Sequence, residues 1–366
     1  MEITLPAEVC KKAHKVLKLP LRGVTKALTV LSYVQVEVDE NGVLFTSTNL
    51  EMSVVYDPGL SYTGGEYGVM LIPLALLDVI GDGFVTFSDD GGEVIRDYLG
   101  KTKDIYINPS DCPVWSAQVD KLVAWFSAEQ MKDLTSLIPF CSKDETRPNL
   151  FAVRLLGKDG FIRFDATDGW KLAMIESAPA FEYEGEQLVP LPVLQKLKGL
   201  LTTVKPNTIG WGIQTVEKNP MHRAQPYGSF WMEYGFGNIE LRYMGIDGNF
   251  PNADPIRYPG EEYAEIETDK LRLYVDAAVK SKQEHVPLVF HDGKMSFGDA
   301  EQPFPNRLEF TIHFNPVYLQ ACLSLFNGHC QFHSIASNLP ATFKTDGREV
   351  ILMPMRAPDY TGIVVS

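Results

Sequence analysis

At 366 residues, the chain has room for two or three domains. Its 45% hydrophobic and 22% charged residues are typical of a globular protein, and no apolar run approaches the ~20 residues that a membrane-spanning helix needs. The net charge of −14 argues against nonspecific binding of nucleic acid by the protein as a whole, although it leaves room for a local basic surface.

The N-terminal residues and the cysteines bear on the cellular compartment. Residues 1–6 contain neither a basic nor an apolar segment, so no signal peptide is predicted. The cysteines are odd in number, widely spaced and without a CxxC pair, which favours a reducing compartment and no disulfide framework. They are Cys10, Cys112, Cys141, Cys322 and Cys330.

The first predicted element is a helix over residues 6–18, because Pro6 suits a first helical turn and apolar residues recur at helical spacing. These apolar residues are Val9, Ala13, Val16 and Leu17. Strands are expected over residues 28–38, 43–48 and 52–56. A short second helix is predicted from Pro73, and strands then continue to residues 105–107.

The same order of elements then begins again. Ser127 and Gln130 have the spacing of a capping box, which predicts a helix over residues 128–138. Strands are expected over residues 150–155 and 160–164, and a helix is expected from Pro192. Two further strands are expected over residues 229–234 and 239–244. Residues 251–260 hold three prolines and are predicted to be a linker.

A third pass opens with Thr268 as the expected cap of a helix over residues 269–280. A second helix is predicted over residues 316–326, and strands are predicted over 286–290, 294–297, 331–335, 341–344 and 350–353. Helices and strands therefore recur in one order three times, in units that open near residues 6, 128 and 269. This pattern predicts three copies of one α+β unit.

Two short sequences support the repeat. Residues 167–170 read Thr-Asp-Gly-Trp, and residues 48–51 read Thr-Asn-Leu-Glu, each directly after an apolar strand. Asp168 and Gly169 are typical of a tight turn that needs positive φ.

At this point the chain resembles a family, the bacterial DNA polymerase III beta subunit or sliding clamp. The resemblance rests on four motifs in order, at residues 144–150, 166–173, 247–251 and 353–356, and on the similarity of residues 48–51 to the family's Thr-Asp-Leu-Glu. It implies three clamp domains, at residues 1–118, 119–255 and 256–366, with 357–366 as a C-terminal extension. The family fold further implies a head-to-tail homodimeric ring, with helices lining the pore and sheets outside.

The resemblance also implies a function. A sliding clamp is a non-catalytic processivity factor that needs no cofactor. It acts in the cytoplasm, where it is associated with the nucleoid. It encircles duplex DNA independently of sequence, and it tethers the polymerase catalytic subunit and the clamp loader through short clamp-binding peptides. The sequence leaves open a clamp-fold peptide-binding module that does not encircle DNA, and an enzyme on a repeated α+β scaffold. The sequence shows no catalytic motif that would support enzymatic chemistry. The spacing of His329 and His333 does not support a metal site.

A sliding contact should touch phosphates without reading bases. Basic residues on or beside the predicted helices are the pore candidates, although lysines on an amphipathic helix can also be merely solvated. They are Lys11, Lys15, Lys18, Arg22, Lys132, Lys196, Lys198, Lys270, Arg272 and Lys280. The chain departs from the family after Pro73 and Pro190, where the usual basic residues are missing.

Two further sites follow from the resemblance. The family's partner-peptide pocket corresponds to Leu150, Thr167, Gly169, Trp170, Lys171, Leu172, Pro251, Ile256, Ile351, Met353, Pro354, Met355 and Arg356. Trp170 stands where the family more often has a polar residue. The dimer interface corresponds to Ile105, Ile107, Ala277 and Lys280.

Overall fold

The computed structural model describes residues 1–21, 29–62, 66–79, 81–90, 93–96, 113, 119–180, 182–214, 226–257, 264–304 and 308–356. The chain folds into two compact units, residues 1–135 with 178–247 (unit 1) and residues 136–177 with 248–366 (unit 2). The boundaries fall inside the expected second domain, residues 119–255, because its strands belong to two different sheets.

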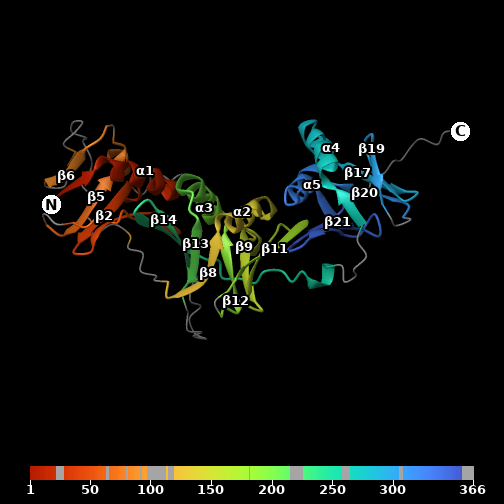
Figure 1. The fold of residues 1–366 in the computed structure, drawn as a ribbon, viewed down its shortest axis with the longest axis horizontal. Coiled ribbons are helices and arrows are strands. Elements are labelled where there is room, and N and C mark those ends of the chain that lie inside the picture. The colour runs from red at the N-terminus through yellow and green to blue at the C-terminus, as the bar shows by residue number, and fades with distance from the viewer. Residues whose placement is uncertain are drawn as a thin grey trace. The chain divides into compact units, whose positions relative to one another are not determined.

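Unit 1 combines helices with two antiparallel sheets (Figure 1). Its helical segments are α1 (Ala7–Leu21), η1 (Thr29–Ser32), η2 (Leu74–Leu77), α2 (Ala128–Ser136) and α3 (Leu191–Val204). Its strands are β1 (Glu2–Pro6), β2 (Tyr33–Asp39), β3 (Gly42–Thr48), β4 (Met52–Asp57), β5 (Gly68–Pro73), β6 (Phe84–Asp90), β7 (Glu93–Arg96), β8 (Lys121–Ser127), β12 (Gly185–Pro190), β13 (Thr208–Ile213), β14 (Tyr227–Tyr234) and β15 (Gly237–Met244). The sheet orders are β1-β6-β7 and β5-β2-β3-β4-β15-β14-β13-β8.

Unit 2 follows the same plan. Its helical segments are η4 (Ile138–Phe140), η5 (Pro148–Leu150), η6 (Asp254–Ile256), α4 (Thr268–Lys280) and α5 (Pro316–Leu323). Its strands are β9 (Ala152–Lys158), β10 (Phe161–Thr167), β11 (Lys171–Pro179), β16 (Ala264–Glu267), β17 (Val286–His291), β18 (Lys294–Phe297), β19 (Ala300–Pro303), β20 (Phe310–Phe314), β21 (His329–His333), β22 (Ala341–Thr345) and β23 (Arg348–Leu352). They run in the orders β9-β10-β11-β23-β22-β21-β16 and β19-β18-β17-β20.

The strand orders confirm the α+β fold and reveal how its repeats are joined. The order β5-β2-β3-β4 recurs as β20-β17-β18-β19, and the second and third repeats end in three-stranded meanders, β13-β14-β15 and β21-β22-β23. One repeat joins the next by antiparallel pairing, of β4 with β15 and of β11 with β23. Val54 lies opposite Leu241 in the first junction, and Leu172 lies opposite Ile351 in the second, all four of them buried.

Helices cover one face of the large sheet of unit 1. Ala13, Val16 and Leu17 of α1 are fully buried, as their spacing predicted, and α1 contacts β3, β4 and α3. A Cβ at Gly199 of α3 would lie 3.3 Å from Leu19 of α1, so a larger residue would separate the two helices. In Figure 1, α1 and α3 accordingly lie side by side.

The helix ends test the local predictions. The capping box is confirmed, since the Ser127 backbone N–H donates to Gln130 Oε1 (2.7 Å) and the Gln130 N–H donates to Ser127 Oγ (3.2 Å). The expected cap of α4 is wrong, because Thr268 lies inside the helix and its hydroxyl donates to the Gly328 carbonyl (3.0 Å). Helix α1 continues past its predicted end, because a proline in the last turn removes only one hydrogen bond while Leu19 and Pro20 gain burial.

The core of unit 2 is aromatic. Phe290 lies 4.7 Å from Phe304 and 5.8 Å from Phe332 between ring centroids, and Phe332 lies 4.9 Å from Phe343. Helices α4 and α5 pack against each other beside this core. The described cysteines are buried thiols outside any disulfide, and Cys112 lies outside the described residues. Among the described helices, none has both the length and the apolar character that crossing a bilayer requires.

Candidate functional site

The turn that joins β10 to β11 is held by its own side chains. The Thr167 hydroxyl donates to the carbonyl of Lys171 (2.8 Å) and accepts the N–H of Gly169 (3.1 Å). Oδ1 of Asp168 accepts the backbone N–H groups of Trp170 (2.9 Å) and Lys171 (3.1 Å). Gly169 has a φ of +96°, which L side chains rarely adopt. The turn leaves Trp170 58% exposed.

The turn between β3 and β4 has the same hydrogen bonds. The Thr48 hydroxyl donates to the carbonyl of Met52 (3.0 Å) and accepts the N–H of Leu50 (3.1 Å). Oδ1 of Asn49 accepts the N–H groups of Glu51 (3.2 Å) and Met52 (2.9 Å). The internal repeat expected from the two short sequences is therefore confirmed, because the two turns share the same four hydrogen bonds. In this alignment Glu51 corresponds to Trp170.

The segment that follows β23 is attached at both ends. The Met353 N–H donates to the carbonyl of Trp170 (2.9 Å), and the Met355 N–H donates to the carbonyl of His313 in β20 (2.7 Å). Pro354 between them has no N–H to satisfy. The segment therefore runs from the Trp170 turn to the edge of β20 with its donors already used.

The junction in unit 1 is attached in the same way. The Met244 N–H donates to the carbonyl of Glu51 (3.0 Å), and the Ile246 N–H donates to the carbonyl of Leu188 (3.0 Å). The two junctions thus share their backbone hydrogen bonds but differ in side chains. Glu51, Leu188, Gly245, Ile246 and Asp247 in the first correspond to Trp170, His313, Pro354, Met355 and Arg356 in the second.

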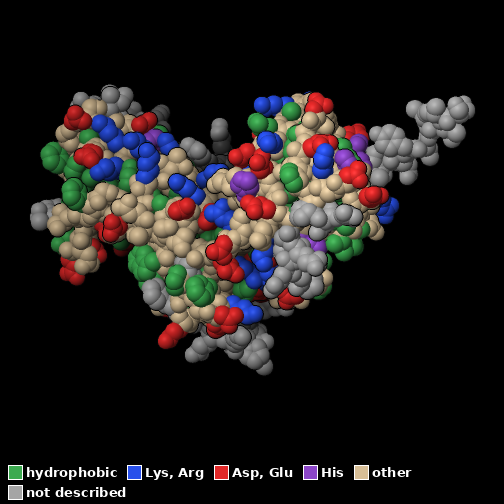
Figure 2. Space-filling model, turned by 45° about the vertical axis from the view of Figure 1, so that its right-hand side comes forward, with side chains coloured by type: hydrophobic (Ala, Val, Ile, Leu, Met, Phe, Trp, Pro, Cys, Tyr) green, Lys and Arg blue, Asp and Glu red, His purple; other side chains and the backbone are tan. Residues whose placement is uncertain are grey.

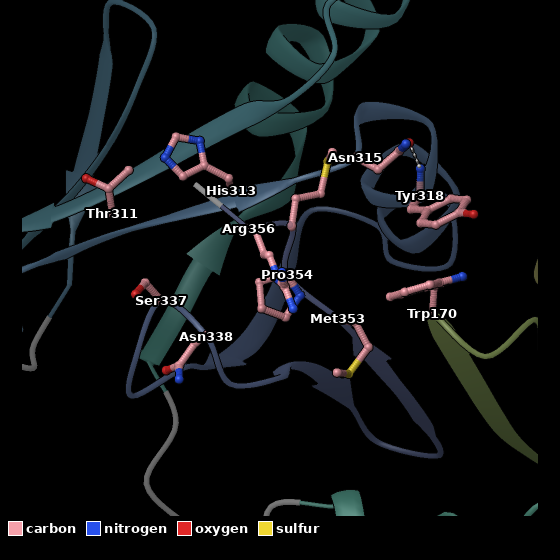
Figure 3. Close-up of a pocket in the computed structure, with 11 residues that line it drawn as sticks. Trp170, Thr311, His313, Asn315, Tyr318, Ser337, Asn338, Met353, Pro354 and Arg356 are labelled. Atoms are coloured by element: carbon pink, nitrogen blue, oxygen red, sulfur yellow. Dashed lines mark hydrogen bonds between the residues drawn. The ribbon is translucent and has the colours of Figure 1, made fainter. Parts of the chain in front are cut away.

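A cavity of about 820 Å³ opens at the second junction. Its lining residues are Trp170, Thr311, His313, Asn315, Tyr318, Ser337, Asn338, Met353, Pro354, Met355 and Arg356. Figure 3 shows them in two groups with Pro354 and Arg356 between, namely Thr311, His313, Ser337 and Asn338 opposite Trp170, Tyr318 and Met353. The cavity therefore has a polar side and an aromatic, thioether-lined side.

A buried ion pair supports the aromatic side. Lys171 is only 5% exposed, its ammonium pairs with Asp168, and it lies 4.1 Å from the ring centroid of Tyr318. Burial, reinforced by the Asp168 charge, raises the pKa of Tyr318. Burial raises the pKa of the nearby Cys141 thiol to about 12, so this thiol is not a nucleophile at neutral pH. The cluster fixes the pocket wall and offers no reactive group.

The residues predicted for the pocket fall into two sets. Those that line the cavity are Trp170, Met353, Pro354, Met355 and Arg356. The others are not part of the lining: Thr167 and Gly169 shape the turn, Lys171, Leu172 and Ile351 are buried, Leu150 is half-buried, and Pro251 and Ile256 are exposed on the segment before β16.

Six lining residues were not predicted from the sequence: Thr311, His313, Asn315, Tyr318, Ser337 and Asn338. Asn315 carried a local signal, because it directly precedes the helix proline Pro316 and its Oδ1 accepts the N–H groups of Val317 and Tyr318. This cap fixes the start of α5 and thereby the position of Tyr318.

The candidate DNA-contacting residues lie mainly on helix surfaces. Figure 2 shows Lys and Arg side chains over the upper left of the view, where α1 lies, with Asp and Glu side chains among them. Lys15, Lys132 and Lys198 are exposed, and Lys18 and Lys196 are half-buried. Lys11 is tied to the carbonyl of Gly81 and to Asp82 (3.3 Å). Arg22 lies outside the described residues.

In unit 2 the fold already uses one of the predicted cations. The guanidinium of Arg272 donates to the carbonyls of Leu323 (2.9 Å) and Phe326 and pairs with Asp269 (3.4 Å). It therefore holds the C-terminal end of α5 against α4. Lys270 and Lys280 are exposed on α4, and Lys270 pairs with Glu267 (3.0 Å).

The residues predicted for the dimer interface are only partly described. Ile105 and Ile107 lie outside the described residues, whereas Ala277 and Lys280 are exposed on α4. Leu273, one turn before Ala277, is 73% exposed and was not predicted. Tyr274 beside it packs on Phe297 with 5.8 Å between ring centroids, which places this part of α4 next to the β18–β19 turn.

This repeated α+β architecture is the DNA clamp fold. Solved structures with the same fold include a putative DNA polymerase III beta subunit from Eubacterium rectale (TM-score 0.80, 13% identity, 97% of this chain and 99% of that chain covered). Others are the DNA polymerase III subunit beta from Pseudomonas aeruginosa (0.79, 20%, 98% and 100%) and the beta subunit from Thermotoga maritima (0.77, 18%, 98% and 100%). No protein-family model and no curated protein sequence matches the chain.

Proposed function

We propose that this protein is a DNA sliding clamp, a non-catalytic processivity factor of a bacterial DNA polymerase III, acting in the cytoplasm at the nucleoid. The observation that carries the proposal is the likeness in fold to DNA polymerase III beta subunits over essentially the whole of both chains. In this reading residues 1–118, 119–255 and 256–366 are the three clamp domains, and two chains close head to tail into a ring.

The strand order supports ring closure. Strand β19 corresponds to β4 and β11, which pair with β15 and β23, but within the described residues β19 pairs only with β18. An open edge at the corresponding position suits pairing with a second copy, because unpaired strand edges seek partners. The exposed face of α4 with Leu273, Ala277 and Lys280 adds a contact surface beside this edge, and we assign Ile105 and Ile107 to the opposing surface of the partner copy.

The charge distribution supports contact with DNA in a protein of net charge −14. Among the described residues, the ammonium groups of Lys15, Lys132 and Lys198 on α1, α2 and α3 form no hydrogen bond or ion pair, so they are available to phosphates. Contacts of this kind are independent of sequence and permit sliding.

The second junction supports partner binding. It shares its backbone hydrogen bonds with the first junction, yet it replaces Glu51 and Asp247 with Trp170 and Arg356. An exposed tryptophan next to Met353 and Met355 suits an apolar peptide anchor, since methionine adapts its shape to ligands. We propose that a clamp-binding peptide from the polymerase catalytic subunit or the clamp loader occupies the cavity.

The test is topological. Protein is incubated at micromolar concentration with a nicked circular plasmid and passed over a sizing column in about 0.5 M salt, where electrostatic contacts are weak. A clamp stays with the circle and leaves it once a single-cut nuclease linearises the DNA. Light scattering should give twice the 40.9 kDa of one chain, about 82 kDa.

A second candidate is a clamp-fold module that binds peptides without holding DNA. The observation that favours it is that Lys11 and Arg272 are already engaged within the protein, while Leu74 and Leu191 occupy positions where the family usually has basic residues. Peptide binding without retention on the circular plasmid would support the module and contradict the clamp.

A further inference from the structure

Two histidines meet at the polar side of the cavity. His313 lines the cavity from β20, and the ring centroid of His285 lies 5.0 Å from that of His313, with the planes at 68°. Pro287 in β17 lies opposite His313, so His285, two residues earlier, projects from the same face of the sheet. The pairing of β17 with β20 therefore brings His285, which directly precedes β17, next to His313.

His313 has an unusual environment for a titratable group. Its Nδ1 is buried and has no hydrogen-bond partner among the described residues. Burial, followed by the neighbouring His285, lowers the pKa of His313. A proton on Nδ1 would be an unpaired buried donor, and two imidazolium ions at this separation would repel each other.

The internal repeat indicates that the pair is not needed for the fold. The position that corresponds to His313 is Leu188, three residues before the start of α3 as His313 is three before the start of α5. Leu188 is buried, and its carbonyl accepts the N–H of Ile246 just as that of His313 accepts the N–H of Met355. The same backbone therefore forms with an apolar side chain, and the histidine adds chemistry rather than structure.

The charges around the pair define the ligand chemistry. Among the described residues, the titratable or charged groups facing His313 are His285, from the segment before β17, and Arg356, from the segment after β23. Thr311 of β20, Asn315 directly after it, and Ser337 and Asn338 of the loop before β22 are neutral. Among the lining residues that the structure describes, Arg356 alone carries a formal charge, so the polar side favours an anionic group.

Resting on the proposed peptide-binding function, we propose that the cavity takes a peptide carrying a carboxylate beside His313 and that its binding is coupled to uptake of one proton by the His285–His313 pair. The carboxylate stabilises the imidazolium that burial otherwise disfavours, so peptide and proton favour each other.

The test compares two synthetic peptides by calorimetry, both containing Gln-Leu-Ser-Leu-Phe and differing only in a flanking Glu or Gln. Titrations at several pH values between about 5.5 and 8, in buffers of different ionisation enthalpy, give both affinity and proton uptake. For the Glu peptide we expect binding about tenfold tighter at the acid end, the effect of a shift of about one pKa unit, with uptake approaching one proton. The Gln peptide should show neither.

Variants test which side chain takes up the proton. His313→Leu, the residue of the corresponding position in the preceding repeat, should abolish the difference in pH dependence between the two peptides. His285→Gln should reduce the proton uptake. His291→Gln is the control, since His291 is bonded to Ser296 (2.9 Å) outside the cavity lining. Equal pH dependence for the two peptides, or for wild type and His313→Leu, would overturn the inference and leave peptide binding standing. A chain that binds neither peptide would overturn the proposed pocket itself.

Discussion

Replacing Lys171 by methionine tests how the aromatic wall of the cavity is held. The substitution keeps most of the side-chain volume but removes the ammonium that pairs with Asp168 and lies 4.1 Å from the Tyr318 ring. Asp168 is 9% exposed, so its carboxylate would be left buried without a counter-charge, keeping only the two backbone donors on Oδ1. Breaking a buried pair of this kind costs about 3–5 kcal/mol.

Hydrogen exchange followed by mass spectrometry measures this cost locally, on amides of β11, without assuming two-state unfolding of the whole chain. The double variant Asp168→Asn with Lys171→Met is the matched control, since it removes both charges and should recover much of the loss. A single variant that opens β11 by less than about 1 kcal/mol, or a double variant as costly as the sum of the two single ones, would refute a buried charge pair as the support.

Three further outcomes are expected. Glutamate at Lys15 and Lys18 should weaken DNA retention at low salt and reduce the slope of log affinity against log salt by about two, whereas Lys158→Glu on β9 should not. Leu273→Asp should give folded monomers by light scattering, because a charge on the exposed face of α4 cannot be buried against a second copy. His313→Leu should stabilise the protein at acid pH. The folded state lowers the pKa of this histidine, so the wild type loses stability as pH falls from the unfolded value of 6.5, and a leucine variant lacks that loss in denaturant titrations.

Much of the fold could be predicted because its signals are local. The Thr-(Asp/Asn) turns and the capping box of α2 each depend on residues within a few positions of one another, and the structure confirms them. The cap of α4 was mispredicted because Thr268 looks like a cap residue, yet a carbonyl from the distant Gly328 is its partner. A tertiary contact of this kind leaves no mark on neighbouring residues.

The difference between local signals and distant contacts also explains which cavity-lining residues could be predicted. Met353 to Arg356 and Trp170 lie in continuous motifs, so they could be assigned from sequence and do line the cavity. Tyr318 and His313 reach it only because β20 pairs with Met355 and because the Asn315 cap fixes the start of α5. Their roles depend on strand register between segments far apart in the chain, which single-sequence patterns do not report.

The two junctions offer the sharpest test of partner binding, since they share one backbone arrangement and differ in their exposed side chains. Because the backbone hydrogen bonds are the same, giving the second junction the side chains of the first should remove partner binding without unfolding the chain. The variant Trp170→Glu with Met355→Ile and Arg356→Asp makes this exchange. Pro354 is kept, because the glycine at the corresponding position, Gly245, is required by its own surroundings: its N–H donates to the Pro226 carbonyl, and a Cβ there would lie 3.1 Å from that oxygen. Losing an exposed tryptophan anchor alone costs about 2–4 kcal/mol of binding, so affinity for the Gln-Leu-Ser-Leu-Phe peptide should fall by at least about thirtyfold. The thermal midpoint should stay within a few degrees of wild type. If peptide affinity survives the exchange, the cavity at the second junction is not the partner site, and the difference between the junctions has another cause.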